Sequence, residues 1–382
     1  MAKLRNIELS KKNGFNNNFL KEIELFRAVA ALLVLYFHAN MVFPKYVERL
    51  ESDYNSLLTF FFEGHTGVSL FFVISGFLLS IKWVVGREVS TKQFYINRAL
   101  RIIPLYYVAL LFYFYVTKTP ENLSFNTIMP YFLFFQNTLI EKADLGGAAG
   151  VFWSLSPEIH FYIMLPFLMV YFRKSRALFY NLIIISLVIK IFMPSLINSI
   201  FGRMDQFLVG VFAADIYFNK LKDLKLKQVL PWGVFFLGIV SLLLFLHRLS
   251  GYGGYTAIGL NWYFWTFFHT GEALLWALII VSFLLISSNI KRFLLNRIFM
   301  GIGTISYSIY IWHYFVIIAL KKTQNRLLES WEWLFTGHAN IDYLIYTTLI
   351  ILPVVLLISI ISYFYIEKPF LLFKSNVNNE KK

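Results

Sequence analysis

The feature that most restricts the fold of this chain is the repetition of long apolar runs. The clearest run extends from Leu344 to Phe364 and has no charged residue in 21 positions. About 20 consecutive apolar residues are needed to cross the hydrocarbon core of a bilayer as an α-helix, and repeated runs of this length are typical of membrane proteins. Because 58% of the 382 residues are hydrophobic, the sequence predicts an all-α, polytopic transmembrane helical bundle.

Ten apolar segments are predicted to span the membrane, and several of them extend into polar flanks. A further apolar run, 128–140, is predicted to be a re-entrant or surface helix on the outer side. We place one membrane domain at 23–370, between cytoplasmic tails at 1–22 and 371–382. The ten predicted spans are 25–42, 67–85, 102–116, 159–172, 177–197, 206–218, 229–246, 264–286, 299–320 and 342–363.

The distribution of basic residues supports this topology. If 128–140 does not cross, 24 Lys and Arg fall in the predicted cytoplasmic segments and nine in the external ones. If it did cross, the basic clusters 173–176 and 220–227 would move outside, against the positive-inside bias. The net charge of +14 therefore reflects topology, and we expect no nucleic-acid partner. We predict a multi-pass protein of the inner (cytoplasmic) membrane with both termini in the cytoplasm.

The first predicted span contains two ionisable residues, Arg27 and His38. Eleven positions separate them, which is about three turns and roughly 16 Å of helix, so they project from nearly the same face. Ionisable side chains within a membrane span are costly and usually face a cavity or a protein interior. Imidazole is a common general base, and guanidinium binds phosphate or carboxylate. The alternative is an Arg27–Glu24 ion pair together with a hydrogen-bonded structural histidine.

Three further charged residues are candidates for a site. Arg98 and Arg101, at i and i+3, share a helix face and suit adjacent phosphates, although they also fit ordinary cytoplasmic flanking charge. Glu158 begins the fourth span and either stabilises its first turn or assists His38. We predict His38, Glu158 and Arg27 as the catalytic set, with Arg98 and Arg101 as a candidate phosphate-binding pair.

Other polar residues of the spans are candidates for lining a shared cavity, although each also fits a hydrogen-bonded structural role. His160 is two positions from Glu158, so the two side chains point to different sides and only one can face a common centre. Lys190 is expected to extend outward to the headgroups. The small residues of 67–77 predict close helix packing. Without cysteine, we expect no disulfide, and we predict no metal site and no bound cofactor. The candidate lining residues are Ser75, His160, Tyr162, Glu272 and His313.

Six short motifs occur in one order along the chain and together resemble the acyltransferase 3 family of integral membrane O-acyltransferases. The resemblance covers nearly the whole chain, from Ile23 to Phe370. The motifs are Ile23–Arg27 followed by His38, Phe71–Phe77, Arg98 with Arg101, Trp153–Tyr162, Ser306–His313 and Glu367–Pro369.

The resemblance implies a bundle that moves an acyl group, commonly acetyl, from cytoplasmic acyl-CoA to a hydroxyl of an exported glycan or a lipid-linked sugar. It implies that His38 is the base or acyl relay and that the paired arginines hold the donor phosphates. Many relatives also carry a periplasmic hydrolase-like domain. We expect its role to be taken by the membrane part or by a separate periplasmic or extracellular partner, or to be absent.

Two other functions fit the residues without the resemblance. In a transporter or flippase for a small anionic or glycan substrate, Arg27, His38 and Glu158 would form a substrate or proton path. A noncatalytic receptor would tolerate replacement of His38. No internal repeat or pair of broken helices is evident in the sequence, which disfavours the transporter.

Overall fold

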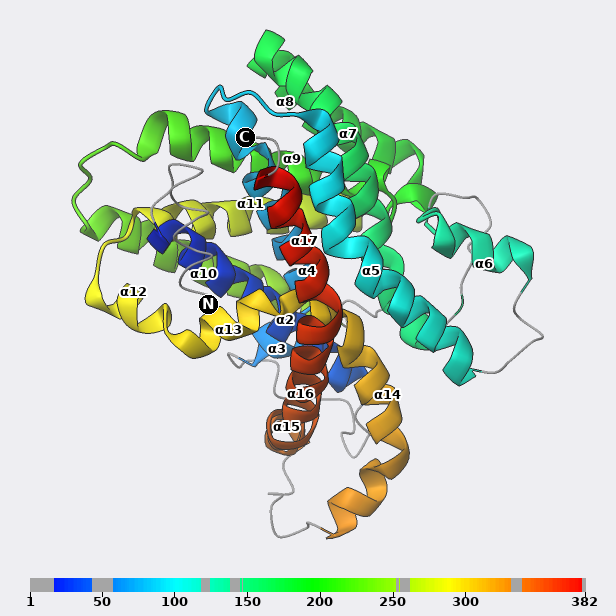
Figure 1. Ribbon diagram of the computed structural model, residues 1–382. Coiled ribbons are helices and arrows are strands. Elements are labelled where there is room, and N and C mark those ends of the chain that lie inside the picture. The colour runs from blue at the N-terminus through cyan, green and yellow to red at the C-terminus, as the bar shows by residue number, and fades with distance from the viewer. Residues whose placement is uncertain are drawn as a thin grey trace.

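A computed structural model gives the fold of the chain. It describes residues 17–42, 58–117, 124–137, 145, 147–251, 254, 262–330 and 339–379. Every regular element in these ranges is a helix, as predicted. Figure 1 shows α2 (Asn17–Val42) and α4 (Thr66–Val84) near the centre of the bundle, with α17 (Lys368–Asn379) crossing in front of them. The remaining α-helices are α3 (Thr59–Phe62), α5 (Thr91–Thr117), α6 (Phe125–Phe132), α7 (Leu155–Lys174), α8 (Arg176–Phe192), α9 (Ile200–Ile216), α10 (Val229–Gly251), α11 (Trp262–Leu285), α12 (Asn289–Leu294), α13 (Arg297–Thr304), α14 (Ser306–Ser330), α15 (Ala339–Tyr346) and α16 (Leu352–Ser362).

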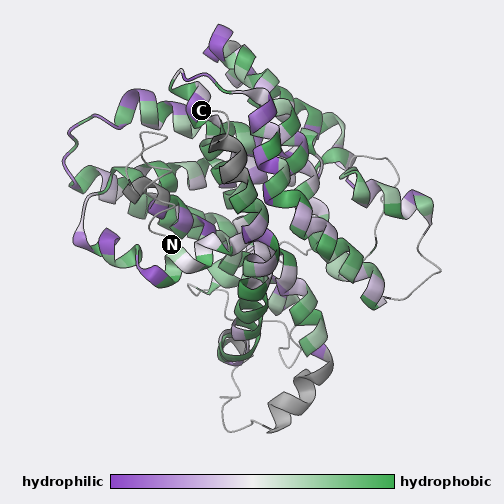
Figure 2. Ribbon diagram, viewed as in Figure 1, coloured by the Kyte–Doolittle hydropathy of each residue, from purple (hydrophilic) through white to green (hydrophobic). Residues whose placement is uncertain are grey.

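The helices have the length and composition of membrane spans. Seven helices in the described part of the chain are long and apolar enough to cross a bilayer, and the bent pair α13–α14 makes eight if it counts as one span. Hydrophobic residues cover most of each helix, whereas α12 and the start of α8 carry hydrophilic turns (Figure 2). Two of the ten predicted spans correspond to α8 and α9, which have 17 residues each. At about 26 Å, these helices are slightly shorter than a bilayer core of about 30 Å.

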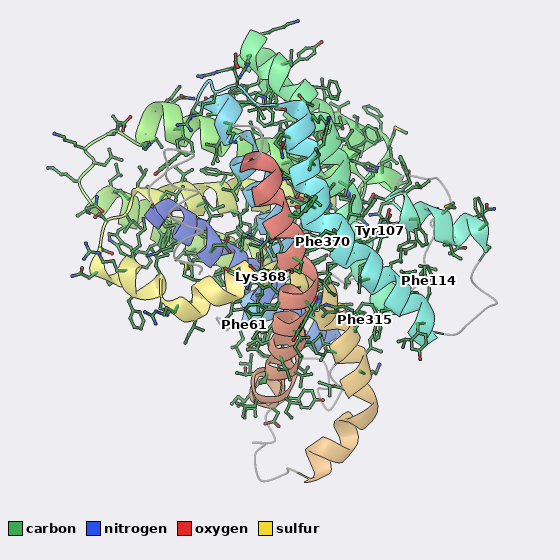
Figure 3. The ribbon with its side chains drawn as sticks, viewed as in Figure 1. Phe61, Tyr107, Phe114, Phe315, Lys368 and Phe370 are labelled. Carbon is green, nitrogen blue, oxygen red and sulfur yellow. The ribbon has the colours of Figure 1, made fainter. Side chains whose placement is uncertain are left out.

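The predicted outer segment 128–140 begins within α6 (Phe125–Phe132), an eight-residue helix. Its length of about 12 Å is too short to span a bilayer. The helix packs against the side of α5, where the rings of Tyr107 and Phe114 stack on Phe132 with centroids 5.7 and 6.2 Å apart. Figure 3 labels both α5 residues. The segment is therefore held at the side of the bundle by aromatic contacts.

Small residues let α4 approach two neighbours closely, as predicted from the 67–77 segment. A side-chain carbon added at Gly67 would clash with the carbonyl oxygen of Ala30 in α2. One added at Gly76 would clash with the carbonyl oxygen of Phe207 in α9, and Gly210 of α9 likewise meets Val73. Such close backbone contact is the usual use of small residues between membrane helices. The contacts fix α2, α4 and α9 as the packed centre of the bundle.

Two distortions shape the C-terminal part of the bundle. Helices α13 and α14 meet at 74°, and a side chain at Gly303, just before the bend, would clash with the backbone of Glu24. Helices α15, α16 and α17 form one continuous helical segment, with π-helical turns at Thr347–Ile351 and Tyr363–Glu367. π-Helical turns often occur at functional positions. The second turn brings Glu367 to α5.

Candidate functional site

A cavity of about 130 Å³ lies between α2, α4, α5, α7 and α14. We call it the arginine cavity, because Arg27, Arg98 and Arg101 all line it. Glu158 is the only carboxylate among the lining residues, so three positive charges and one negative give the lining a formal charge of +2. Ser75 and Tyr162 also line the cavity, as predicted. A partly enclosed site with this charge is suited to an anionic ligand.

The three arginines differ in how their charge is compensated. Arg27 donates to Glu24 over 3.1 Å, as the structural alternative proposed, and still lines the cavity. Arg101 forms an ion pair with Glu367 at 3.5 Å, while its Nη2 is buried without a hydrogen-bond partner. Arg98 has no ion pair in the described residues, and its buried Nε also lacks a partner. Buried donors without partners are rare and costly, so they favour an anion at this place.

Glu367 is a site residue that the sequence did not single out beyond its motif. It is 2% exposed, and Ser308 donates to its Oε1 over 2.5 Å. The same carboxylate holds Arg101 from the opposite side of the cavity wall. Its position depends on the π-helical turn 363–367, which local sequence does not reveal. Glu367 therefore fixes the direction of one of the three guanidinium groups.

Glu158 lies in the arginine cavity, and its contacts are with hydroxyl groups. Ser75 donates to Glu158 Oε1 over 3.0 Å, and Tyr162, one turn later on α7, donates to the same oxygen in a short hydrogen bond. In the described part of the chain, His38 and Glu158 share no hydrogen bond. The contacts thus give no support to a direct interaction between Glu158 and His38, and they join the carboxylate to Ser75 and Tyr162 in the wall of the arginine cavity.

His38 instead contacts His313 of α14. The Nδ1 atom of His38 lies 3.1 Å from His313 Nε2 and 3.0 Å from the carbonyl oxygen of Val34. His313 is fully buried, and its Nδ1 lies 2.7 Å from the carbonyl oxygen of Tyr310. A carbonyl oxygen only accepts, so Nδ1 of neutral His313 carries the proton and Nε2 accepts from His38 Nδ1. This network leaves Nε2 of neutral His38 with a free lone pair.

Two aromatic side chains, Phe71 and Tyr310, form the wall of the arginine cavity on the side of the histidine pair. Phe71 and Tyr310 line the cavity, and their ring centroids are 5.9 Å apart. The ring of Tyr310 also lies 5.7 Å from that of His313. Tyr310 is fixed in place, because its hydroxyl donates to Val151 over 2.9 Å and accepts from Ser154 over 2.5 Å. The histidine pair is therefore separated from the cavity by one layer of ordered aromatic side chains.

Three predicted lining residues are not among those that line the cavity. His160 contacts Phe135, with ring centroids 4.9 Å apart and the rings tilted by 46°, because its position two residues after Glu158 turns it to another side of α7. His313 is separated from the cavity by the ring of Tyr310. Glu272 lies on α11, which does not border the cavity. These three residues therefore lie outside the arginine cavity.

Glu272 belongs to a second polar cluster that the sequence did not reveal, which we define as Glu63, His65, Lys190, Asp205 and Glu272. His65 lies 3.3 Å from a carboxylate oxygen of Glu63 and 3.3 Å from one of Glu272. Lys190 pairs with Asp205 at 2.8 Å, and both side chains are fully buried. The prediction that Lys190 extends outward is therefore wrong. The carboxylate of Asp205, on the neighbouring helix, holds it inside.

Comparison with known proteins places the chain in context. The acyltransferase 3 family model, described as an acyltransferase domain, matches residues 20–365. Peptidoglycan O-acetyltransferase OatA of Listeria monocytogenes serovar 1/2a is 25% identical over 348 residues, which cover 81% of this chain and 51% of that protein. Nodulation protein 10 of Rhizobium leguminosarum bv. viciae is 27% identical over 184 residues, covering 43% and 47% respectively. The chain thus spans about half the length of these relatives. No solved structure matches it.

Proposed function

This chain belongs to the acyltransferase 3 family, and we propose that it transfers an acetyl group from cytoplasmic acetyl-CoA to a hydroxyl of an exported glycan or lipid-linked sugar. The observation that carries the proposal is the arginine cavity, where Arg98 has no ion pair in the described residues and where the ring of Tyr310 lies next to His313, the neighbour of His38. CoA is polyanionic, and arginine forks suit its phosphates. The acceptor part of the proposal is supported by the similarity to OatA, a peptidoglycan O-acetyltransferase.

In the proposed reaction, Arg98 and Arg101 hold the phosphates of the donor, and the thioester extends past Tyr310 toward His38. The acceptor oxygen attacks the thioester carbonyl carbon, and its proton passes to His38 Nε2, the nitrogen that the hydrogen-bond network leaves free. The carbon–sulfur bond breaks as the carbon–oxygen ester bond forms. The CoA thiolate then receives the proton from His38. Atoms and charge balance without a further reactant, and general-base catalysis of this kind contributes about 10² to 10⁴ in rate.

The direct test uses purified protein in lipid vesicles with radiolabelled acetyl-CoA and peptidoglycan fragments or other surface glycans as acceptors. We expect free CoA and a labelled, base-labile ester to appear in equal amounts. Movement of the glycan across the membrane without release of CoA would instead identify a transporter. Absence of both ester and CoA release with every glycan class tried would contradict acyl transfer.

The proposal also requires an orientation, with the arginine cavity open to the cytoplasm. The chain has no cysteine, so single introduced cysteines report their exposure without background. Lys174→Cys at the end of α7 should resist an impermeant maleimide in intact cells, whereas Phe125→Cys on α6, where the side chain is 71% exposed, should react. Both cysteines should react after the cells are opened. The reverse pattern in intact cells would contradict this orientation and the predicted cytoplasmic termini.

A further inference from the structure

A second cavity, of about 310 Å³, lies where α2 begins and α11 ends. Its lining includes Lys21 and Glu22 of α2, residues 286–288 after α11, and Lys291 and Arg292 of α12. It has no lining residue in common with the arginine cavity. Glu22 and Arg27 are five positions apart, which turns their side chains by about 140° around the helix. The two cavities therefore lie on different sides of α2.

The charges of this second cavity are only partly compensated. The Nζ atom of Lys291 lies 2.5 Å from Glu22 and donates to the carbonyl oxygens of Phe283 and Ile286, each over 2.8 Å. This lysine is fully occupied in holding α12 to α2 and to the end of α11. Lys21 and Arg292 form no ion pair with any described residue. Two positive charges thus remain available to a ligand.

The position of the cavity indicates what kind of anion reaches it. Lys21 and Glu22 come just before the apolar run 25–42 of α2, and α11 ends at Leu285, so the cavity lies at the ends of two spans, at the level of the lipid headgroups. Next to it, Ile290 and Phe293 of α12 are 63% and 75% exposed. They are three positions apart and share a helix face. Basic and apolar side chains together on a short helix beside a span are typical of a segment in the membrane interface.

We propose that this cavity binds the headgroup phosphate of an anionic phospholipid, with Lys21 and Arg292 as its cationic contacts and the acyl chains beside Phe293. The lipid would then join the start of α2 to α11 and α12, next to the Glu22–Lys291 ion pair. Each basic residue near an anionic lipid contributes about fivefold to affinity, so the two together account for roughly 25-fold. This site is independent of the proposed acyl transfer.

The test measures binding of phosphatidylglycerol to purified protein in detergent micelles by native mass spectrometry, with phosphatidylcholine as the reference lipid. The variant Lys21→Gln/Arg292→Gln should bind phosphatidylglycerol roughly 25-fold more weakly and phosphatidylcholine unchanged. A matched control, Lys225→Gln/Lys227→Gln, removes the same charge from exposed residues of another loop and should bind as the wild type does. The single variant Arg292→Gln alters an exposed side chain and gives the same test if the double variant folds poorly.

Other ligands are separated by competition. Inorganic phosphate and glycerol phosphate carry the same charge without acyl chains, and they should not displace phosphatidylglycerol at equal concentration. Effective displacement by them would identify a site for soluble anions and overturn the proposal. Displacement by acetyl-CoA would identify a donor entrance and would also overturn it. Equal lipid binding by the wild type and the double variant would show that the two cations do not form a site.

Discussion

The arginine cavity and the second polar cluster both place ionisable groups inside an apolar bundle, but they differ in how the charges are compensated. In the cluster, His65 contacts two carboxylates at 3.3 Å, and Lys190 and Asp205 pair at 2.8 Å. In the cavity, Arg27 and Arg101 pair with Glu24 and Glu367, whereas Arg98 has no ion pair in the described residues. Buried ions are stable when they are paired, so the cluster contains its own counterions whereas the cavity favours an external anion.

The largest expected effect comes from the histidine pair beyond the cavity. His38→Gln keeps a polar side chain but cannot accept a proton at neutral pH, so acyl transfer should fall by about 10² to 10⁴. Binding of acetyl-CoA and thermal unfolding should stay near wild type, because the arginines are untouched. The control His160→Gln changes a histidine that contacts Phe135 outside the cavity and should remain active. A His38→Gln rate above about a tenth of wild type would show that His38 is not a general base.

The second effect concerns stability and the polar cluster. Lys190→Met leaves the carboxylate of Asp205 buried without its cation, and breaking a buried pair in this way typically costs about 3 to 5 kcal/mol. The double variant Lys190→Met/Asp205→Leu removes both charges and should regain most of that loss. The free energy of unfolding of the wild type and of both variants is measured on purified protein in micelles. The rate of acyl transfer is measured per folded molecule. A fall in the rate of acyl transfer without a change in the free energy of unfolding would show that the Lys190–Asp205 pair has a functional role and not a structural one.

The third effect is on donor binding. Arg98→Ala should weaken acetyl-CoA binding by roughly 10- to 150-fold, because charge-assisted bonds contribute about 1.5 to 3 kcal/mol. Arg98→Lys should regain part of the lost affinity for acetyl-CoA, since lysine keeps the positive charge but lacks the forked guanidinium group. Unlike Lys190, Arg98 can be removed without leaving a buried carboxylate unpaired, so the unfolding free energy should change little. If Arg98→Ala lost much stability and kept its affinity for acetyl-CoA, Arg98 would have the structural role that we assign to Lys190, and the cavity would not be a donor site.

The sequence predicted which ionisable side chains lie in or near the cavity better than it predicted which residues contact them. The arginine pair follows from spacing on one helix, and the importance of His38 follows from the cost of an imidazole in a membrane span. The neighbour of His38 is 275 positions away, at His313, and no local pattern indicates it. The same holds for Asp205, which keeps Lys190 inside. Pairings of this kind depend on how helices pack, and that depends on small residues such as Gly76 more than on the charged residues themselves.

The smallest expected effect concerns the aromatic layer that separates the cavity from the histidines. Phe71→Leu shortens one side of this layer, while Tyr310 stays fixed by Ser154 and Val151. A shorter side chain should admit a longer acyl group, so the ratio of propanoyl to acetyl transfer should rise by roughly tenfold, near the lower limit for the discrimination of one methylene group.

Phe112→Leu is the matched control for this change. Phe112 packs on Trp312 and Phe315 outside the cavity, so its replacement should leave the ratio unchanged. Because the ratio compares two donors on one enzyme, a general loss of folded protein cancels from it. A ratio that stays at the wild-type value while acetyl transfer continues would mean that the acyl group reaches His38 by a route that avoids Phe71, and that the layer only packs the bundle.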